Sequence, residues 1–173
     1  MFGTDQTAQD ALKEALEILS KVSSSPEKAL TAAFVDGSNE RKTHRGGCAV
    51  VYYRYAPGRK DDGLRVEKAW SVSPNMYSDV TEGMAIAEAI RAFVKDLRCL
   101  ASEDSGDGPE VPMRRITIVI FSDSASMLSL IENTQGAPLD RDLNVRHKLL
   151  GIIVDESRKL ASIPGFETRL ELR

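Results

Sequence analysis

The chain has 173 residues, of which 42% are hydrophobic and 28% are charged, and its net charge is −3. This composition is typical of an ordinary globular domain, and the negative charge argues against nucleic-acid binding through a basic surface spread over the whole chain. No apolar run reaches the about 20 residues needed to span a bilayer, and the first residues lack a signal-peptide pattern. We expect an intracellular protein, cytoplasmic or nuclear, with no membrane partner and with Cys48 and Cys99 as buried free thiols.

The first part of the chain predicts one helix and then three strands. Residues 8–22 have one apolar side, which is typical of an amphipathic helix. A linker rich in serine follows, so we divide the chain into an N-terminal helix and linker (1–26) and a domain (27–173). Apolar and β-branched runs in that domain predict an antiparallel meander with strands over residues 30–35, 48–55 and 64–72.

After Pro74 the hydrophobic period changes to that of a helix. Apolar residues recur every three or four positions from Ile86 to Leu100, which is one helix face. An acidic loop follows over 101–112. The remaining elements are a strand over 116–121, helices over 124–133 and 143–161, and a strand over 166–172. The expected order is β-β-β-α-β-α-α-β, an α/β sheet with an antiparallel flank.

Three acidic residues stand where these elements end or begin. Asp36 follows the first expected strand, Asp123 follows the fourth, and Glu82 lies one turn before the apolar helix face. A sheet of this kind gathers its functional groups outside the carboxyl ends of its strands. Three carboxylates there need a counter-ion, and a hard divalent cation such as Mg²⁺ is the usual one.

Each acidic residue also has a structural explanation when it is taken alone. Asp36 fits an Asp-Gly turn, and Asp123 fits a helix cap. Glu82 would complete a capping box if Asp79 began its helix.

Together with their neighbours, the three residues resemble the motifs of type 1 ribonuclease H. That family has a first strand ending in Asp-Gly-Ser, a helix that begins with Glu-x-x-Ala, and a fourth strand ending in Thr/Ser-Asp-Ser. This chain has Asp36-Gly37-Ser38, Glu82-Gly83-Met84-Ala85 and Ser122-Asp123-Ser124 in the same order. The resemblance implies a ribonuclease H-like five-stranded mixed sheet flanked by helices, to which the N-terminal helix is added.

The resemblance also implies an endonuclease that hydrolyses the RNA strand of RNA–DNA hybrids with two Mg²⁺ ions, or with Mn²⁺. Asp36, Glu82 and Asp123 would be both the catalytic and the metal-binding residues. Asp79, where the family often has asparagine, cannot donate a hydrogen bond, so hybrid specificity stays open. The residues expected to contact the substrate are Gly37, Ser38, Arg41, Lys42, Arg45, Ser78 and Ser124, although the basic residues among them are equally well explained as a solvated loop.

The resemblance ends before the last metal-binding aspartate of the family. In the family, the last strand is followed by a segment with a histidine and by a helix with Ala-Asp. This chain stops at Arg173. The domain would lack that C-terminal helix, and Asp155 and Glu156, in mid-helix, are expected to be solvated rather than to replace the missing acid. The chain is then either part of a longer nuclease or a catalytically impaired module that binds nucleic acid or protein. The helix over 8–22 would pack on its own sheet or dock a partner, such as an upstream polymerase domain.

Overall fold

The computed structural model describes residues 13, 17, 28–40, 45–54, 65–72, 77–103, 113–134 and 144–173. Their order of elements confirms the predicted order of five strands and three helices in the domain. Of the expected N-terminal helix only residues 13 and 17 are described, both helical, so its role stays a prediction. The elements are β1 (Lys28–Glu40), β2 (Arg45–Tyr53), β3 (Arg65–Val72), α2 (Ser78–Glu103), β4 (Arg114–Phe121), α3 (Ala125–Asn133), α4 (Val145–Ala161) and β5 (Phe166–Leu172).

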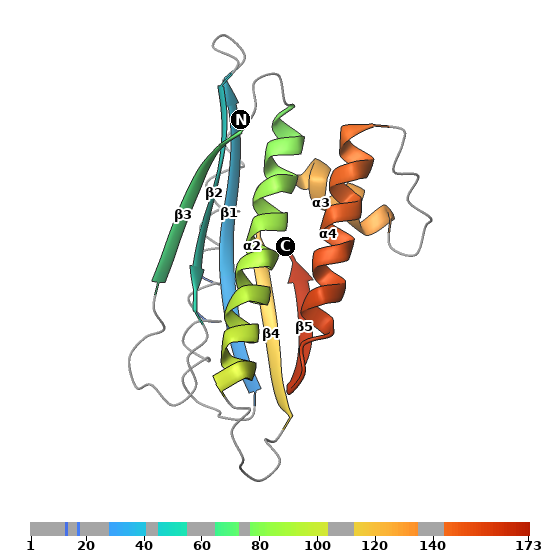
Figure 1. Ribbon diagram of the computed structural model, residues 1–173. Helices are drawn as coiled ribbons and strands as arrows, with labels where there is room; N and C mark the ends of the chain where they lie inside the picture. The colour runs from blue at the N-terminus through green and yellow to red at the C-terminus, as the bar shows by residue number, and fades with distance from the viewer. Residues whose placement is uncertain are drawn as a thin grey trace.

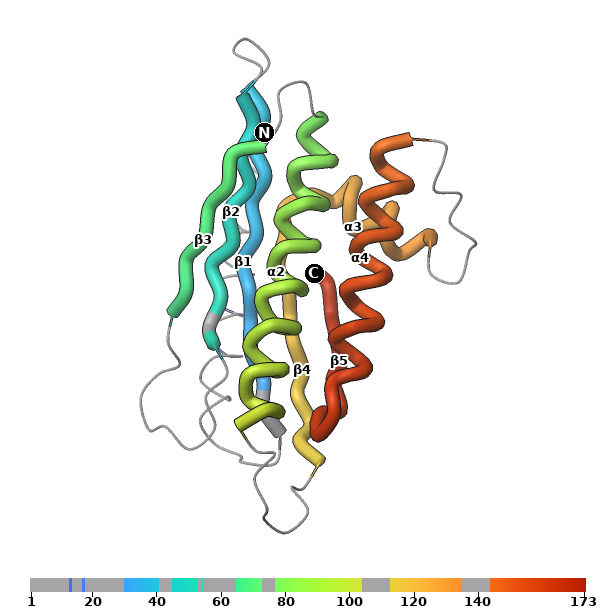
Figure 2. Tube along the Cα trace, viewed as in Figure 1, coloured from blue at the N-terminus to red at the C-terminus, as the bar shows by residue number. Residues whose placement is uncertain are grey.

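The five strands form one mixed sheet in the order β3-β2-β1-β4-β5. The strands β1, β2 and β3 pair antiparallel, whereas β1 pairs parallel with β4 and β4 pairs parallel with β5. Figure 1 shows α2 lying across the sheet with α4 beside it. The helix α4 packs against α2 and β5, and α3 packs against α2 (Figure 2). None of the described helices is both long enough and apolar enough to cross a membrane.

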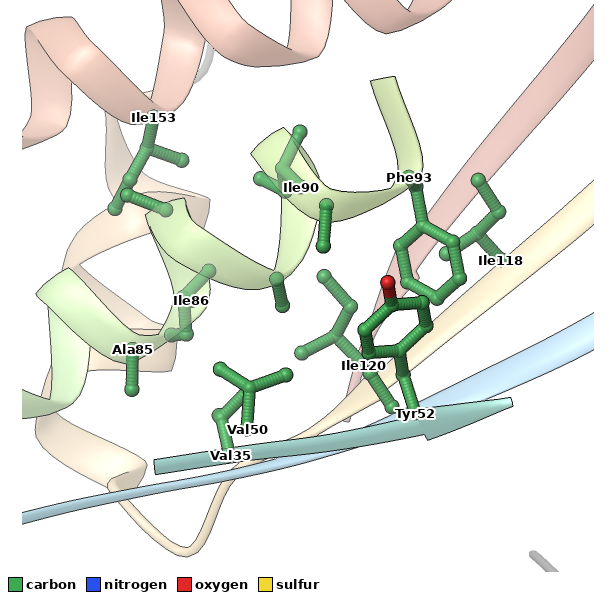
Figure 3. Packing of buried hydrophobic residues seen from close by; sticks show 14 of the residues in the cluster. Val35, Val50, Tyr52, Ala85, Ile86, Ile90, Phe93, Ile118, Ile120 and Ile153 are labelled. Atoms are coloured by element: carbon green, nitrogen blue, oxygen red, sulfur yellow. The ribbon is translucent and has the colours of Figure 1, made fainter. Parts of the chain in front are cut away.

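The main core lies between α2 and the sheet. Ile86, Ile90 and Phe93 of α2 belong to this core together with strand residues (Figure 3), as the spacing of apolar residues predicted. Phe93 meets the ring of Tyr52 edge-on, with 5.2 Å between the ring centroids. The core also contains Val35, Val50, Ile118 and Ile120 from the strands and Ile153 from α4.

The first strand is longer than the sequence predicted. We expected it to end at Asp36, but β1 continues to Glu40 because β2 pairs with it from Ala33 to that point. The parallel pairing with β4 ends earlier, at Phe34 opposite Phe121. The long-range ladder with β2 therefore overrides the turn tendency of the Asp-Gly pair.

Two further expectations were wrong because they depended on packing between elements. Cys48 is buried as expected, but Cys99 is exposed, and both thiols are free. Burial raises the pKa of Cys48, and the nearby Glu88 and Glu82 raise it further. Glu156 is not solvated: it is 7% exposed, and its Oε1 accepts hydrogen bonds from Arg91 of α2 (3.2 Å) and from Lys159 (2.9 Å).

The Glu156→Gln substitution should lower the free energy of unfolding by about 2 kcal/mol at pH 7, because two cations lose a buried charged partner. Burial alone would raise the pKa of Glu156, but hydrogen bonds from Lys159 and Arg91 outweigh it and the pKa is lowered. A lowered pKa stabilises the fold above about pH 4.5, and this contribution is lost as the pH falls through the folded-state value. Urea unfolding at several pH values checks this: the gap between the variant and the wild type should close at low pH. Glu132→Gln, at an exposed position, is the control, and a gap that does not depend on pH would contradict the prediction.

Candidate metal centre

The structure brings Asp36, Glu82 and Asp123 together. One carboxylate oxygen from each residue lies within 4.8 Å of the corresponding oxygens of the other two. Asp36 and Asp123 are exposed, whereas Glu82 is only 6% exposed. The expectation that the three acids meet at one edge of the sheet therefore agrees with the geometry.

The parallel register of β1 and β4 places the two aspartates side by side. Phe34 lies opposite Phe121 in the last pair of this ladder, and each strand carries an aspartate two residues further on. Because side chains alternate along a strand, Asp36 continues the side of Phe34, whereas Asp123 lies just beyond the end of β4. Beyond the ladder, the N–H of Ser122 donates to the carbonyl of Arg173 (2.9 Å), which holds the segment before Asp123 against the end of β5.

Glu82 reaches the aspartates because α2 begins in close contact with β1. The backbone N–H of Gly37 donates a hydrogen bond to the Glu82 carboxylate. A Cβ atom at Gly37 would lie 2.5 Å from the carbonyl carbon of Thr81 and 2.8 Å from the Cα atom of Glu82. Only a glycine allows β1 and the first turns of α2 to approach this closely.

The structural explanations for the three acids do not hold. The helix α2 begins at Ser78, so Asp79 lies inside its first turn and cannot be the cap of a capping box. The helix α3 is capped by Ser124, whose side chain accepts a hydrogen bond from the N–H of Met127 (3.4 Å), and not by Asp123. Asp36 lies within a strand rather than in a turn. Cap and turn roles therefore do not account for these three carboxylates.

The environment of Glu82 disfavours its charge. Burial is the main cause that raises its pKa to about 7, the charges of Asp123 and Asp36 add to this, and the hydrogen bond from Gly37 opposes it. Its Oε2 atom is buried and has no hydrogen-bond partner among the described residues. Without a cation, a carboxyl group with this pKa is about half protonated near pH 7.

These residues fit a hard divalent cation. They offer only carboxylate oxygens, which Mg²⁺ and Mn²⁺ prefer. Two ligands of one Mg²⁺ ion lie at most about 4.2 Å apart, so an arrangement within 4.8 Å needs only small side-chain rotations. A cation would also give the unpaired Oε2 of Glu82 a partner.

The other residues expected to contact substrate have more varied positions. Ser38 is exposed on β1, two residues beyond Asp36 and on the same side of the strand. Ser78 is exposed as the first residue of α2, and Arg45 is exposed at the start of β2 opposite Glu40. Gly37 and Ser124 have the structural roles given above, and Arg41 and Lys42 lie outside the described residues.

Arg146 is a residue near this site that the sequence did not indicate. Its Nε atom lies 2.6 Å from Oδ2 of Asp79, which is one helical turn before Glu82. Its guanidinium also lies over the ring of Tyr77, 5.8 Å from the centroid, and Tyr77 is 72% exposed. No local pattern signals this contact, because it depends on how the beginnings of α2 and α4 meet.

No family model and no curated protein matches the sequence. Among solved structures, the chain is similar to LC9-RNase H1, a type 1 RNase H with the type 2 active-site motif. The identity is 18%, the match covers 83% of this chain and 62% of that chain, and the TM-score is 0.49. It is also similar to RNase H1 from the halophilic archaeon Halobacterium salinarum NRC-1, with 19% identity, 84% of each chain covered and a TM-score of 0.41.

This chain spans less than two thirds of the length of LC9-RNase H1. The five-stranded mixed sheet agrees with the ribonuclease H-like fold expected from the sequence. Similarities of this size concern the general fold only.

Proposed function

We propose that this chain is a ribonuclease H-type domain that hydrolyses the RNA strand of RNA–DNA hybrids and requires Mg²⁺ or Mn²⁺. The observation that supports this is the convergence of Asp36, Glu82 and Asp123, with a buried and unpaired oxygen on Glu82. Burial of an unpaired carboxylate oxygen costs folding free energy. When it lies beside solvent-exposed groups of the same kind, it is typical of a functional site.

The three carboxylates have distinct roles in this proposal. Asp36 and Asp123 are exposed and would hold the metal at the surface where a phosphate can approach. Glu82 would hold the inner side of the same centre, fixed by the Gly37 N–H. The bound ions would supply an activated water and stabilise the leaving oxygen.

Contacts with the nucleic acid would come from the surface around this centre. We propose Ser38, Arg45 and Ser78 for this role because they are exposed on β1, β2 and α2. Gly37 and Ser124 would contribute backbone groups there, and Arg41 and Lys42 would add positive charge for the phosphates.

The Asp36→Asn substitution tests the catalytic proposal. It should lower metal-dependent cleavage of the RNA strand by about 10³-fold or more, because one metal ligand loses its charge. The assay compares the full-length wild-type chain and the variant on an RNA–DNA hybrid with Mg²⁺ or Mn²⁺, and uses the DNA duplex of the same sequence as a second substrate. Asp155→Asn on α4 removes the same charge away from the site and should leave cleavage unchanged.

A catalytically impaired module is the alternative function. Among the described residues the acidic group has three carboxylates, and Asp79, which cannot donate a hydrogen bond to a substrate, is paired with Arg146. If the wild type binds the hybrid but does not cleave it with either metal, the catalytic proposal is wrong and the module remains. If it neither binds nor cleaves, both functions are excluded.

A further inference from the structure

A second apolar cluster lies on the face of the sheet that points away from α2. Ala33 and Val35 of β1 belong to the main core under that helix, so the residues that alternate with them face the other way. There Ala32, Val119 and Phe121 are buried, and Leu30 and Phe34 pack against them. This cluster lies between β1, which carries Asp36, and β4, which ends two residues before Asp123.

The two phenylalanines of this cluster stack on each other. Their ring centroids are 5.2 Å apart and their planes differ by 13°. Phe121 is 7% exposed, and Phe34 is partly exposed. They are also backbone partners in the parallel register, so the stack directly joins the two strands.

The stack is the last contact of the β1–β4 ladder before the metal centre. Beyond it β1 is paired with β2, where Asp36 lies opposite Ala49. The segment with Asp123 instead turns toward β5 and α3, held by Ser122, which donates to Arg173 and accepts from the N–H of Ser124 (3.2 Å). The two aspartates thus belong to segments that diverge immediately after Phe34 and Phe121.

We propose that Phe34 and Phe121 are positioning residues that keep Asp36 and Asp123 close enough to share a divalent cation. This inference rests on the proposed function. Two carboxylates at this distance repel each other, and their strands share no further ladder pair that would oppose the repulsion. The stacked rings act as a cross-strand pair that resists separation at this point.

The test measures Mn²⁺ binding to the full-length chain by isothermal titration calorimetry. Phe121→Leu and Phe34→Leu should each weaken Mn²⁺ binding about tenfold, as removal of a group that supports metal ligands does. Phe34→Tyr keeps the ring at a partly exposed position and should bind Mn²⁺ as the wild type does.

Phe166→Leu is the matched control. Phe166 is 5% exposed and lies opposite Arg114, at the other end of β4. The Phe166→Leu variant therefore loses a similar buried ring far from the aspartates. We expect Phe166→Leu and Phe121→Leu to lower the melting temperature similarly. Only Phe121→Leu should weaken Mn²⁺ binding. The milder Phe34→Leu keeps the test valid if Phe121→Leu does not fold.

The possible results are distinct. Wild-type Mn²⁺ affinity in both leucine variants, or an equal loss in Phe166→Leu, would overturn the positioning role while leaving the metal centre intact. A wild-type chain that does not bind Mn²⁺ would instead overturn the proposed metal-dependent function, and the positioning role with it.

Discussion

Replacement of Gly37 by alanine should destabilise the protein by about 3 kcal/mol and abolish binding of Mn²⁺. The new Cβ atom would lie 2.5 Å from a backbone carbon of Thr81, and backbone atoms cannot move aside as a flexible side chain can. The start of α2 would have to shift away from β1. That shift would break the Gly37 hydrogen bond to Glu82 and carry the carboxylate away from the aspartates.

Urea unfolding and Mn²⁺ titration measure the two effects of Gly37→Ala. Gly47→Ala is a control in the neighbouring strand, because its Cβ would approach only the carbonyl oxygen of Trp70, at 3.3 Å. It should cost much less stability and leave metal binding unchanged. If both variants were equally stable, the close packing of β1 against α2 would not be the reason for glycine at position 37.

Replacement of Glu82 by glutamine should stabilise the metal-free protein at pH 8 by up to about 3 kcal/mol while it removes metal binding. The Glu82 pKa is about 7 in the folded chain, against 4.5 for an ordinary glutamate. Between these values the folded state binds the extra proton, so stability falls as the pH rises from about 4.5 through about 7. Glutamine has no such charge and does not incur this loss.

Melting temperatures of wild type and Glu82→Gln from pH 4 to pH 8 provide the measurement. We expect similar values near the acid end and a growing advantage of the variant above about pH 5. In titrations near pH 6, Mn²⁺ binding to the wild type should release a proton, which buffers of different ionisation enthalpy detect. Parallel pH profiles for the two proteins would show that Glu82 is not held protonated by the fold.

Gly37 and Glu82 lie on the enclosed side of the site, whereas the two aspartates lie on its exposed side. Glu82 is enclosed by the start of α2 and the backbone of β1, so its position depends on a close backbone contact. Asp36 is exposed on β1 and Asp123 just beyond the end of β4, and in our proposal their separation depends on the phenylalanine stack at the end of the β1–β4 ladder. A change at Gly37 should therefore displace Glu82, whereas a change at the stack should alter the separation of the two aspartates.

Much of the fold was visible in the pattern of hydrophobic residues. The apolar face from Ile86 to Leu97 is buried against the sheet as predicted, and the alternating and continuous apolar runs gave the correct order of strands and helices. These signals are local, because the period of a helix or strand is written directly in the spacing of side chains. The predicted end of β1 was wrong. The Asp-Gly pair favours a turn locally, and only pairing with β2 keeps this part of the chain extended.

The candidate site was predictable in its members but not in its energetics. The residue types and their places near the ends of elements indicated that Asp36, Glu82 and Asp123 would converge. The capping box proposed for Asp79 and Glu82 failed because Asp79 lies inside α2 and pairs with Arg146, a residue of α4. Such a pair depends on how two helices are arranged, which no local pattern contains.

Local sequence was thus sufficient for the types of elements, their order and the three acidic residues at one edge of the sheet. Long-range packing set the rest: the register that aligns Asp36 with Asp123, the burial that raises the pKa of Glu82 to about 7, and the partners of Glu156. The physical reason is that hydrophobic period and turn tendency act between neighbours in the chain. Register, desolvation and ion pairing act between segments that meet only after the chain has folded.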